Sequence, residues 1–106
     1  MPAYIVDLKA DRNWIELIER LKAALLKRLG DSLLKIVALY SPNDRVYDSN
    51  VLVVVREDGQ EAVEAVIEAA MEAERSMGLE GIISPLVVSP EERRIIEGFE
   101  GFEIVC

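Results

Sequence analysis

Apolar residues recur every three or four positions along two long segments, and this spacing is typical of helices with one buried face. The first helix is predicted over Asp11–Leu29, where Asp11 can cap the start and Gly30 follows the end. The second is predicted over Gln60–Met77 and stops at Gly78. Its expected buried stripe consists of Val63, Val66, Ile67, Ala70, Met71 and Met77. Its expected solvent side consists of Glu61, Glu64, Glu68 and Glu72.

Continuous apolar and β-branched runs predict strands between and after these helices. Leu33–Tyr40 is expected to be a buried strand, and Val51–Val55 a central strand covered on both faces. Between them, Ser41-Pro42-Asn43-Asp44 is a concentrated turn signal. Ile82–Val88 is the third predicted strand, and Pro85 places it at an edge or a bulge because proline has no N–H for the ladder.

The last third of the chain predicts a short helix that begins at Ser89-Pro90-Glu91-Glu92 and ends at Gly98. Tyr4–Leu8 and Phe102–Cys106 are expected to be short edge strands. The predicted order is therefore α-β-β-α-β-α, with an optional terminal strand. Two strands joined by a short loop should be antiparallel or staggered, and two joined by a helix should be parallel with a right-handed crossover. The expected fold class is α+β or α/β: one mixed β-sheet with flanking helices, in a single domain over residues 1–106.

Composition and charge exclude several classes of function. The 106 residues carry a net charge of −8, which argues against a nucleic-acid binder. Histidine is absent and Cys106 is the sole cysteine, so the sequence offers no disulfide framework, no cysteine metal cluster and no Ser-His or Cys-His catalytic pair. Neither a signal peptide nor a membrane-spanning apolar run is found, and we expect a cytoplasmic protein. Threonine is absent and charged residues are abundant, a bias typical of hyperthermophiles.

The stretch from Ile36 to Val55 carries the candidate chemistry. Tyr40 ends an apolar run, Arg45 lies in the following loop, and Asp48-Ser49-Asn50 leads straight into Val51–Val55. This arrangement resembles the core of the minimal nucleotidyltransferases, small relatives of the catalytic domain of DNA polymerase β. In that family an aromatic residue precedes Gly-Ser, a basic loop follows, and Asp-x-Asp leads into an apolar strand. The resemblance implies a nucleotidyltransferase-like mixed sheet, and the predicted elements follow the family's order.

In that family, two aspartates two positions apart hold Mg²⁺ ions that bridge the nucleotide phosphates, and Gly-Ser amides receive the phosphate oxygens. A third carboxylate comes from the neighbouring strand. Here Ser41-Pro42 replaces Gly-Ser, Asn50 replaces the second aspartate, and Ser84 or Pro85 falls where the third carboxylate belongs. The resemblance therefore implies a member that has lost its catalytic metal site, with no catalytic residue, no metal ligand and no cofactor. The residues that it implies for residual nucleotide binding are Ser41, Arg45, Asp48, Ser49 and Asn50.

Such a pseudoenzyme is expected to act through protein contacts. Minimal family members pair with small helical HEPN partners in modules that look like toxin–antitoxin pairs, so the resemblance implies such a partner, and self-association is the other expectation. One alternative is an active nucleotidyltransferase that uses ATP and Mg²⁺, with Asp48 as ligand and Asp44 or Asp58 recruited beside it. Another is an unrelated small α/β ligand-binding module. At Asp48 itself, a simple turn residue competes with a metal ligand. Trp14 is expected in the core or as an interface anchor.

Overall fold

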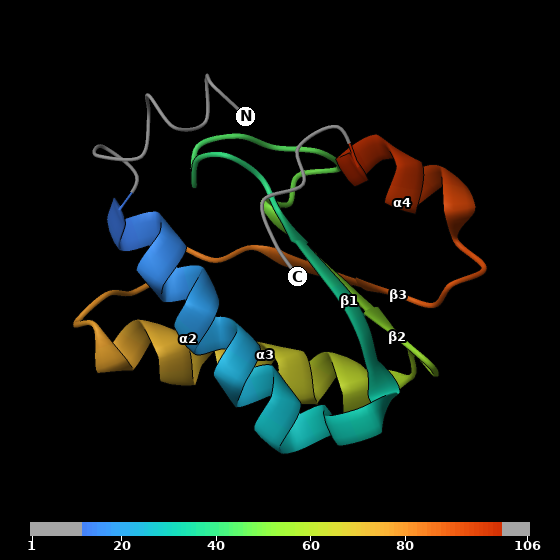
Figure 1. Ribbon diagram of the computed structural model, residues 1–106, viewed down its shortest axis with the longest axis horizontal. Helices are drawn as coiled ribbons and strands as arrows, with labels where there is room; N and C mark the ends of the chain where they lie inside the picture. Colours follow the sequence, from blue (N-terminus) through green and yellow to red (C-terminus); the bar gives the residue numbers. More distant parts are fainter. Residues whose placement is uncertain (1–11, 101–106) are drawn as a thin grey trace.

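A computed structural model describes residues 12–100 and shows a small mixed α+β fold (Figure 1). Within this range the elements are α2 (Arg12–Leu29), a 3₁₀ turn (Gly30–Ser32), β1 (Leu33–Ala38), β2 (Val51–Val55), α3 (Gln60–Ser76), β3 (Pro85–Val88) and α4 (Arg93–Glu100). The predicted strands Tyr4–Leu8 and Phe102–Cys106, and the predicted cap Asp11, lie outside the described residues. None of the helices in this range is long and apolar enough to cross a membrane.

The three strands form one sheet in the order β1-β2-β3. β1 and β2 are antiparallel, with Ala38 opposite Val51, whereas β2 and β3 are parallel, with Val51 opposite Pro85. Both directions confirm the expectation drawn from the lengths of the connections. Pro85 begins β3 at the edge of the sheet, where a missing N–H costs no ladder bond. The strand starts later than predicted because the N–H groups of Ile82 and Ile83 donate to a side chain instead.

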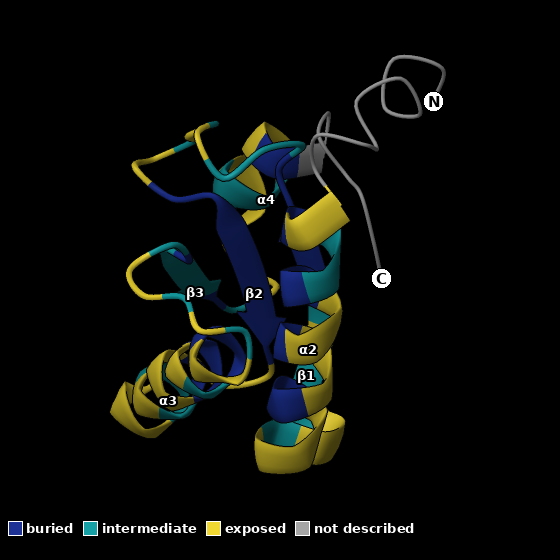
Figure 2. Ribbon diagram, turned by 90° about the vertical axis from the view of Figure 1, so that its left-hand side faces the viewer, coloured by how far each residue is buried: buried dark blue, intermediate teal, exposed yellow. Residues whose placement is uncertain are grey.

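Each face of the sheet has its own apolar core. Residues of β2 alternate between the two cores, and all five are buried. The strand is accordingly coloured as buried in Figure 2. The core on the side of α2 and α3 contains Ile36, Ala38, Val51, Val53 and Val55 of the sheet and Trp14, Leu17, Leu21 and Leu25 of α2. The core on the side of α4 contains Val37, Leu39, Leu52, Val54 and Val88, which pack with Phe99 of α4. The prediction of a central strand covered on both sides is therefore confirmed.

The buried face of α3 is rotated from the predicted one. Its buried apolar residues are Val66, Ala69, Ala70 and Ala73. Ile67 is 46% exposed and Met71 is 48% exposed, so the prediction that both lie in the buried stripe was wrong. Alanine carries the contact here because small side chains let α3 approach α2 and the sheet closely. The larger apolar side chains of α3 are left on an outer flank.

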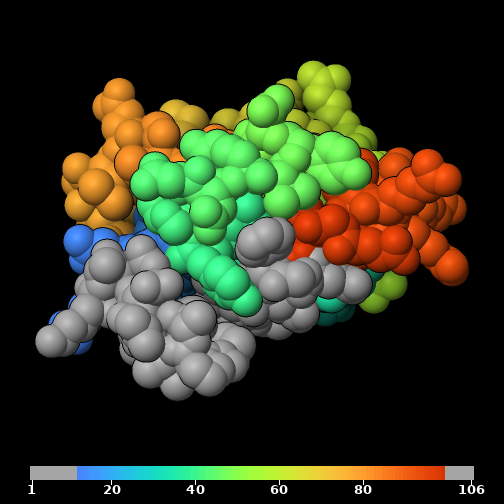
Figure 3. Space-filling model, turned by 90° about the horizontal axis from the view of Figure 1, so that it is seen from above, coloured from blue at the N-terminus to red at the C-terminus, as the bar shows by residue number. Residues whose placement is uncertain are grey.

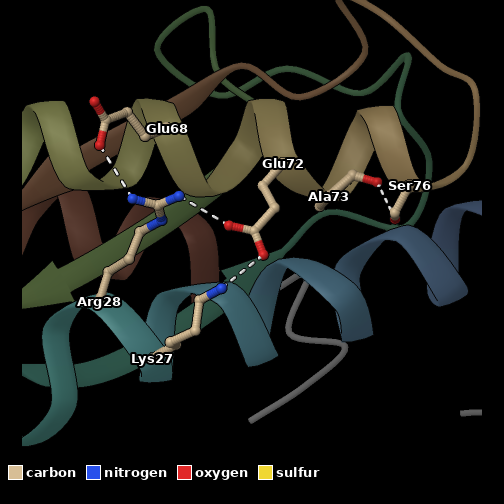
Figure 4. Close-up of polar contacts among 6 residues, drawn as sticks. All are labelled: Lys27, Arg28, Glu68, Glu72, Ala73 and Ser76. Carbon is tan, nitrogen blue, oxygen red and sulfur yellow. Dashed lines mark hydrogen bonds and ion pairs between the residues drawn. The ribbon is translucent and has the colours of Figure 1, made fainter.

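Ion pairs join the exposed edges of α2 and α3 (Figure 4). Arg28 contacts Glu68 at 3.1 Å and Glu72 at 2.8 Å, and Lys27 contacts Glu72 at 3.1 Å. Hydrogen bonds from Arg28 and then Lys27 lower the pKa of the Glu72 carboxyl. Two glutamates of the expected solvent side thus serve as interhelical contacts.

The last helix differs from its predicted bounds at both ends. Residues 89–92 form a turn, closed by the N–H of Glu92 donating to the carbonyl of Ser89 at 3.1 Å, and α4 begins at Arg93. It continues through Gly98 to Glu100. A Cβ at Gly98 would lie 3.4 Å from Cε2 of Tyr47, so a small residue suits this contact between α4 and the loop before β2. The helix signal placed the element correctly, while its ends were set by packing.

Candidate functional site

All five candidate nucleotide-binding residues lie in the loop that joins β1 to β2. This loop occupies one end of the molecule, between the segment that leads into β3 and α4 (Figure 3). Its first part is a turn in which the N–H of Asp44 donates to the carbonyl of Ser41 at 3.1 Å. The hydroxyl of Ser41 accepts the N–H of Asn43 at 3.2 Å. Ser41 therefore uses its side chain within the turn.

A two-residue hairpin turn forms the middle of the loop. Val46 and Ser49 exchange two backbone hydrogen bonds of 2.9 Å each. Tyr47 and Asp48 between them have φ angles of 51° and 62°, which is the pattern of a type I′ turn. Asp48 is exposed at the tip, and Ser49 is 6% exposed beneath it. The interpretation of Asp48 as a turn residue is confirmed.

The guanidinium of Arg45 folds back onto its own loop. Its Nη1 donates to the carbonyl of Pro42 and, at 2.9 Å, to that of Asp44. The side chain is exposed but pinned at one nitrogen by these contacts. A phosphate at this place would have to share the Arg45 guanidinium with two backbone carbonyls.

The side chain of Asn50 makes three hydrogen bonds to backbone groups of this region. Its side chain is fully buried, and its amide nitrogen donates to the carbonyls of Pro42 at 3.1 Å and Ile82 at 2.9 Å. Its amide oxygen accepts the N–H of Ser84 at 2.8 Å. Its backbone N–H donates to the carbonyl of Ser84 at 3.0 Å, and its carbonyl accepts the N–H of Leu39 at 3.0 Å. One side chain thus ties together the loop and the segment before β3.

These contacts place Asn50 and Ser84 side by side. The resemblance implies the second carboxylate at position 50 and the third at position 84 or 85. Asn50 and Ser84 are both neutral. Pro42 presents a carbonyl to Asn50 and Arg45 and has no N–H to offer a phosphate. Within residues 12–100, no group of three His, Cys, Asp or Glu residues is placed so that it can hold a metal ion.

A buried carboxylate that sequence reasoning missed supports this arrangement from α3. Glu74 is 6% exposed and accepts the N–H groups of Ile82 and Ile83 at 2.7 Å each. It therefore holds the segment that delivers Ser84 to Asn50. A signal was present in the sequence, because Glu74 continues the four-residue spacing of the buried Val66 and Ala70.

Trp14 is the second anchor that helps to place the loop. It is 4% exposed, which confirms a core position, and its indole N–H donates to the carbonyl of Leu39 at 2.8 Å. This bond fixes the end of the first strand to α2 just before the loop begins. The strand itself ends at Ala38 and not at Tyr40.

Two pockets are lined by residues of α2, α3 and the turns that adjoin them. One of about 650 Å³ lies between the end of α2 and the start of α3, with Arg28, Gln60 and Glu61 among its lining residues. It is at the other end of β1 and β2 from Asn50. Another of about 280 Å³ lies between α2 and α3, where Arg20 and Lys27 are already bonded to Ser76 and Glu72.

No family model, no curated protein and no solved structure matches this chain.

Proposed function

We propose that this chain is a nucleotidyltransferase-like domain that no longer holds the catalytic metal ions and acts through protein contacts. The observation that carries the proposal is the state of Asn50. The resemblance assigns this position to a metal-binding aspartate, and here an amide is buried and bonded to three backbone groups.

The chemistry at position 50 is specific for an amide. Two of its contacts are donated hydrogen bonds to carbonyl oxygens, and an ionised aspartate has no hydrogen to donate. A carboxylate there would face two carbonyl oxygens in a buried site, which is unfavourable. The residue therefore serves the fold in a way that a cation ligand cannot.

The arrangement of elements supports the family assignment within this proposal. Helix, strand, strand, helix, strand and helix follow one another in the order that the resemblance implies. Asn50 and Ser84 directly precede the neighbouring strands β2 and β3 and are hydrogen-bonded to each other, as expected for the positions of the second and third carboxylates. Asp48 is the one carboxylate left among the three positions, and it is exposed at the tip of its turn.

Isothermal titration calorimetry with MgATP tests the loss of the metal site. We expect no saturable heat up to millimolar ligand, with the same result when Mn²⁺ replaces Mg²⁺. The control is ATP with EDTA, because binding of ATP alone would show a nucleotide site without metal chemistry. Saturable binding that requires the divalent ion and is lost in Asp48→Asn would overturn the proposal in favour of an active nucleotidyltransferase.

The partner is a separate part of the proposal. A helical partner of the HEPN type and a second copy of this chain are the two candidates that the resemblance and the exposed apolar residues support. Sedimentation of the purified protein separates them, because self-association needs no second component.

A further inference from the structure

A strip of exposed residues lies on the outer flank of α3 in the described structure. Ile67 and Met71, which are 46% and 48% exposed, are four residues apart and so lie on the same side of the helix. They are also two of the five large apolar residues that the described structure exposes, and no other two of the five lie so close in sequence on one helix. We call Glu64, Ile67, Met71 and Arg75 the α3 strip.

The flanks of the α3 strip are occupied by contacts within the chain. On one side, Glu68 and Glu72 pair with α2. On the other, Glu74 holds the segment before β3. The strip therefore lies between two sets of contacts within the chain.

Charge is distributed unevenly along the strip. Glu64, at its N-terminal end, is exposed and accepts one hydrogen bond of 3.2 Å from Gln60. Arg75, at its C-terminal end, is exposed and makes no ion pair or side-chain hydrogen bond with any described residue. The strip thus runs from an acid, through two apolar residues, to a base.

This order is complementary to itself when the helix is reversed. The midpoint between Ile67 and Met71 is position 69, and the midpoint between Glu64 and Arg75 lies only half a residue further along. One two-fold axis near position 69 therefore places Ile67 against Met71 of a second copy and Glu64 against Arg75 of that copy. A contact of this kind is isologous, the commonest type in homodimers.

We infer that the α3 strip is a docking surface for a second copy of this chain, with the two α3 helices antiparallel. The inference names a partner for the interaction role proposed above and rests on that role. A pair of helices buries less than the roughly 1,600 Å² of a standard interface, so we expect a weak dimer. Two Glu64–Arg75 pairs offset the repulsion between two copies that each carry a charge of −8.

Analytical ultracentrifugation of the full chain from about 10 μM to 1 mM tests the inference, because this range covers weak association. We expect the mean mass to rise from 11.9 kDa toward twice that value. Met71→Lys should weaken association at least ~10-fold, because it puts a charge at the apolar centre. The matched control is Leu26→Lys on α2, where the replaced side chain is 49% exposed, and it should leave association unchanged.

A mixture of two charge variants identifies the pairing. Glu64→Arg places two cations in each contact of its own homodimer, and Arg75→Glu places two anions there, so each variant alone should associate less than the wild type. Mixed in equal amounts, they form a heterodimer in which both contacts again join opposite charges. The mixture should therefore associate at least ~5-fold more tightly than either variant alone, as expected for close charge pairs.

Three results would overturn the inference: a wild-type protein that stays at 11.9 kDa throughout, an equal loss of association in Leu26→Lys, or a mixture no tighter than its components. Far-UV circular dichroism shows whether each variant is folded, and all of these positions are exposed. A monomeric protein would leave the assignment of the Asn50 region untouched. Conversely, metal-dependent binding of ATP would overturn that assignment and not the dimer.

Discussion

Asn50→Asp replaces one atom group at the centre of the proposed site. The wild-type amide donates to the carbonyls of Pro42 and Ile82, and the variant carboxylate can donate to neither. Each buried carbonyl left without its donor costs about 1–3 kcal/mol, and the Pro42 carbonyl retains a contact from Arg45. The buried charge adds to this cost, so we expect a loss of about 3–5 kcal/mol at neutral pH.

Urea unfolding measures this loss directly. A chain of this length has a total stability of roughly 5–15 kcal/mol, so the variant keeps a folded state but with a midpoint lower by about 2–3 M. The pKa of the introduced carboxyl should be raised, because burial beside carbonyl oxygens disfavours its charged form. A raised pKa in the folded state means that stability is lost as the pH rises, so the deficit of the variant should shrink as the pH falls toward about 4.

The control is the reverse change two residues away. Asp48→Asn lies at an exposed turn position with a positive φ, where asparagine is well tolerated, so its stability should stay within about 0.5 kcal/mol of the wild type. A near-neutral Asn50→Asp would refute the reasoning. So would recovery of its stability on addition of millimolar Mg²⁺ or Mn²⁺, because the introduced carboxylate would then be facing a cation.

Three further changes probe the surroundings of this region. Asp48→Gly should raise the free energy of unfolding by up to about 1 kcal/mol, because glycine adopts a positive φ without steric cost; urea unfolding checks it, and a lower midpoint would contradict the type I′ assignment. Gly98→Ala should add about 0.5–1 kcal/mol, since the new Cβ meets Cε2 of Tyr47 at 3.4 Å within an α-helix, and a thermal melt that falls would show that the contact is too tight. Glu72→Gln should destabilise the protein at pH 7, and this deficit should shrink as the pH falls below the ordinary range of a carboxyl group. The lowered pKa of Glu72 gives a contribution that is present above its unfolded pKa and lost as the pH falls through the folded one; a difference in urea midpoint that does not change with pH would contradict this.

The secondary structure was predictable wherever the sequence pattern is strong. The run of valines in Val51–Val55 required burial on both faces, and the lengths of the two connections predicted the antiparallel and the parallel pairing. Pro85 predicted an edge. The face of α3 was not predictable in the same way, because alanine is nearly neutral in a hydrophobic pattern and the contact with α2 selects Ala69, Ala70 and Ala73 over larger residues.

The turn residues of the candidate region were recognisable in the sequence, but its hydrogen bonds were not predictable. The partners of Asn50 come from Pro42, Ile82 and Ser84, which are up to 34 residues away in sequence, and no local rule pairs an asparagine with such distant carbonyls. The role of Glu74 depends in the same way on where the following loop runs. Local turn chemistry was sufficient for Asp48, because both hydrogen bonds of its turn are made within four residues.

Paramagnetic broadening by Mn²⁺ in a two-dimensional ¹H–¹⁵N spectrum tests the central claim most directly, because it reports where an ion sits residue by residue. We predict weak, non-saturating losses spread over the exposed glutamates, with the amide signals of Asp48, Asn50 and Ser84 no more affected than the rest. A selective loss of these three signals that saturates at sub-millimolar Mn²⁺ and is strengthened by ATP would contradict the claim that this region has lost its metal site.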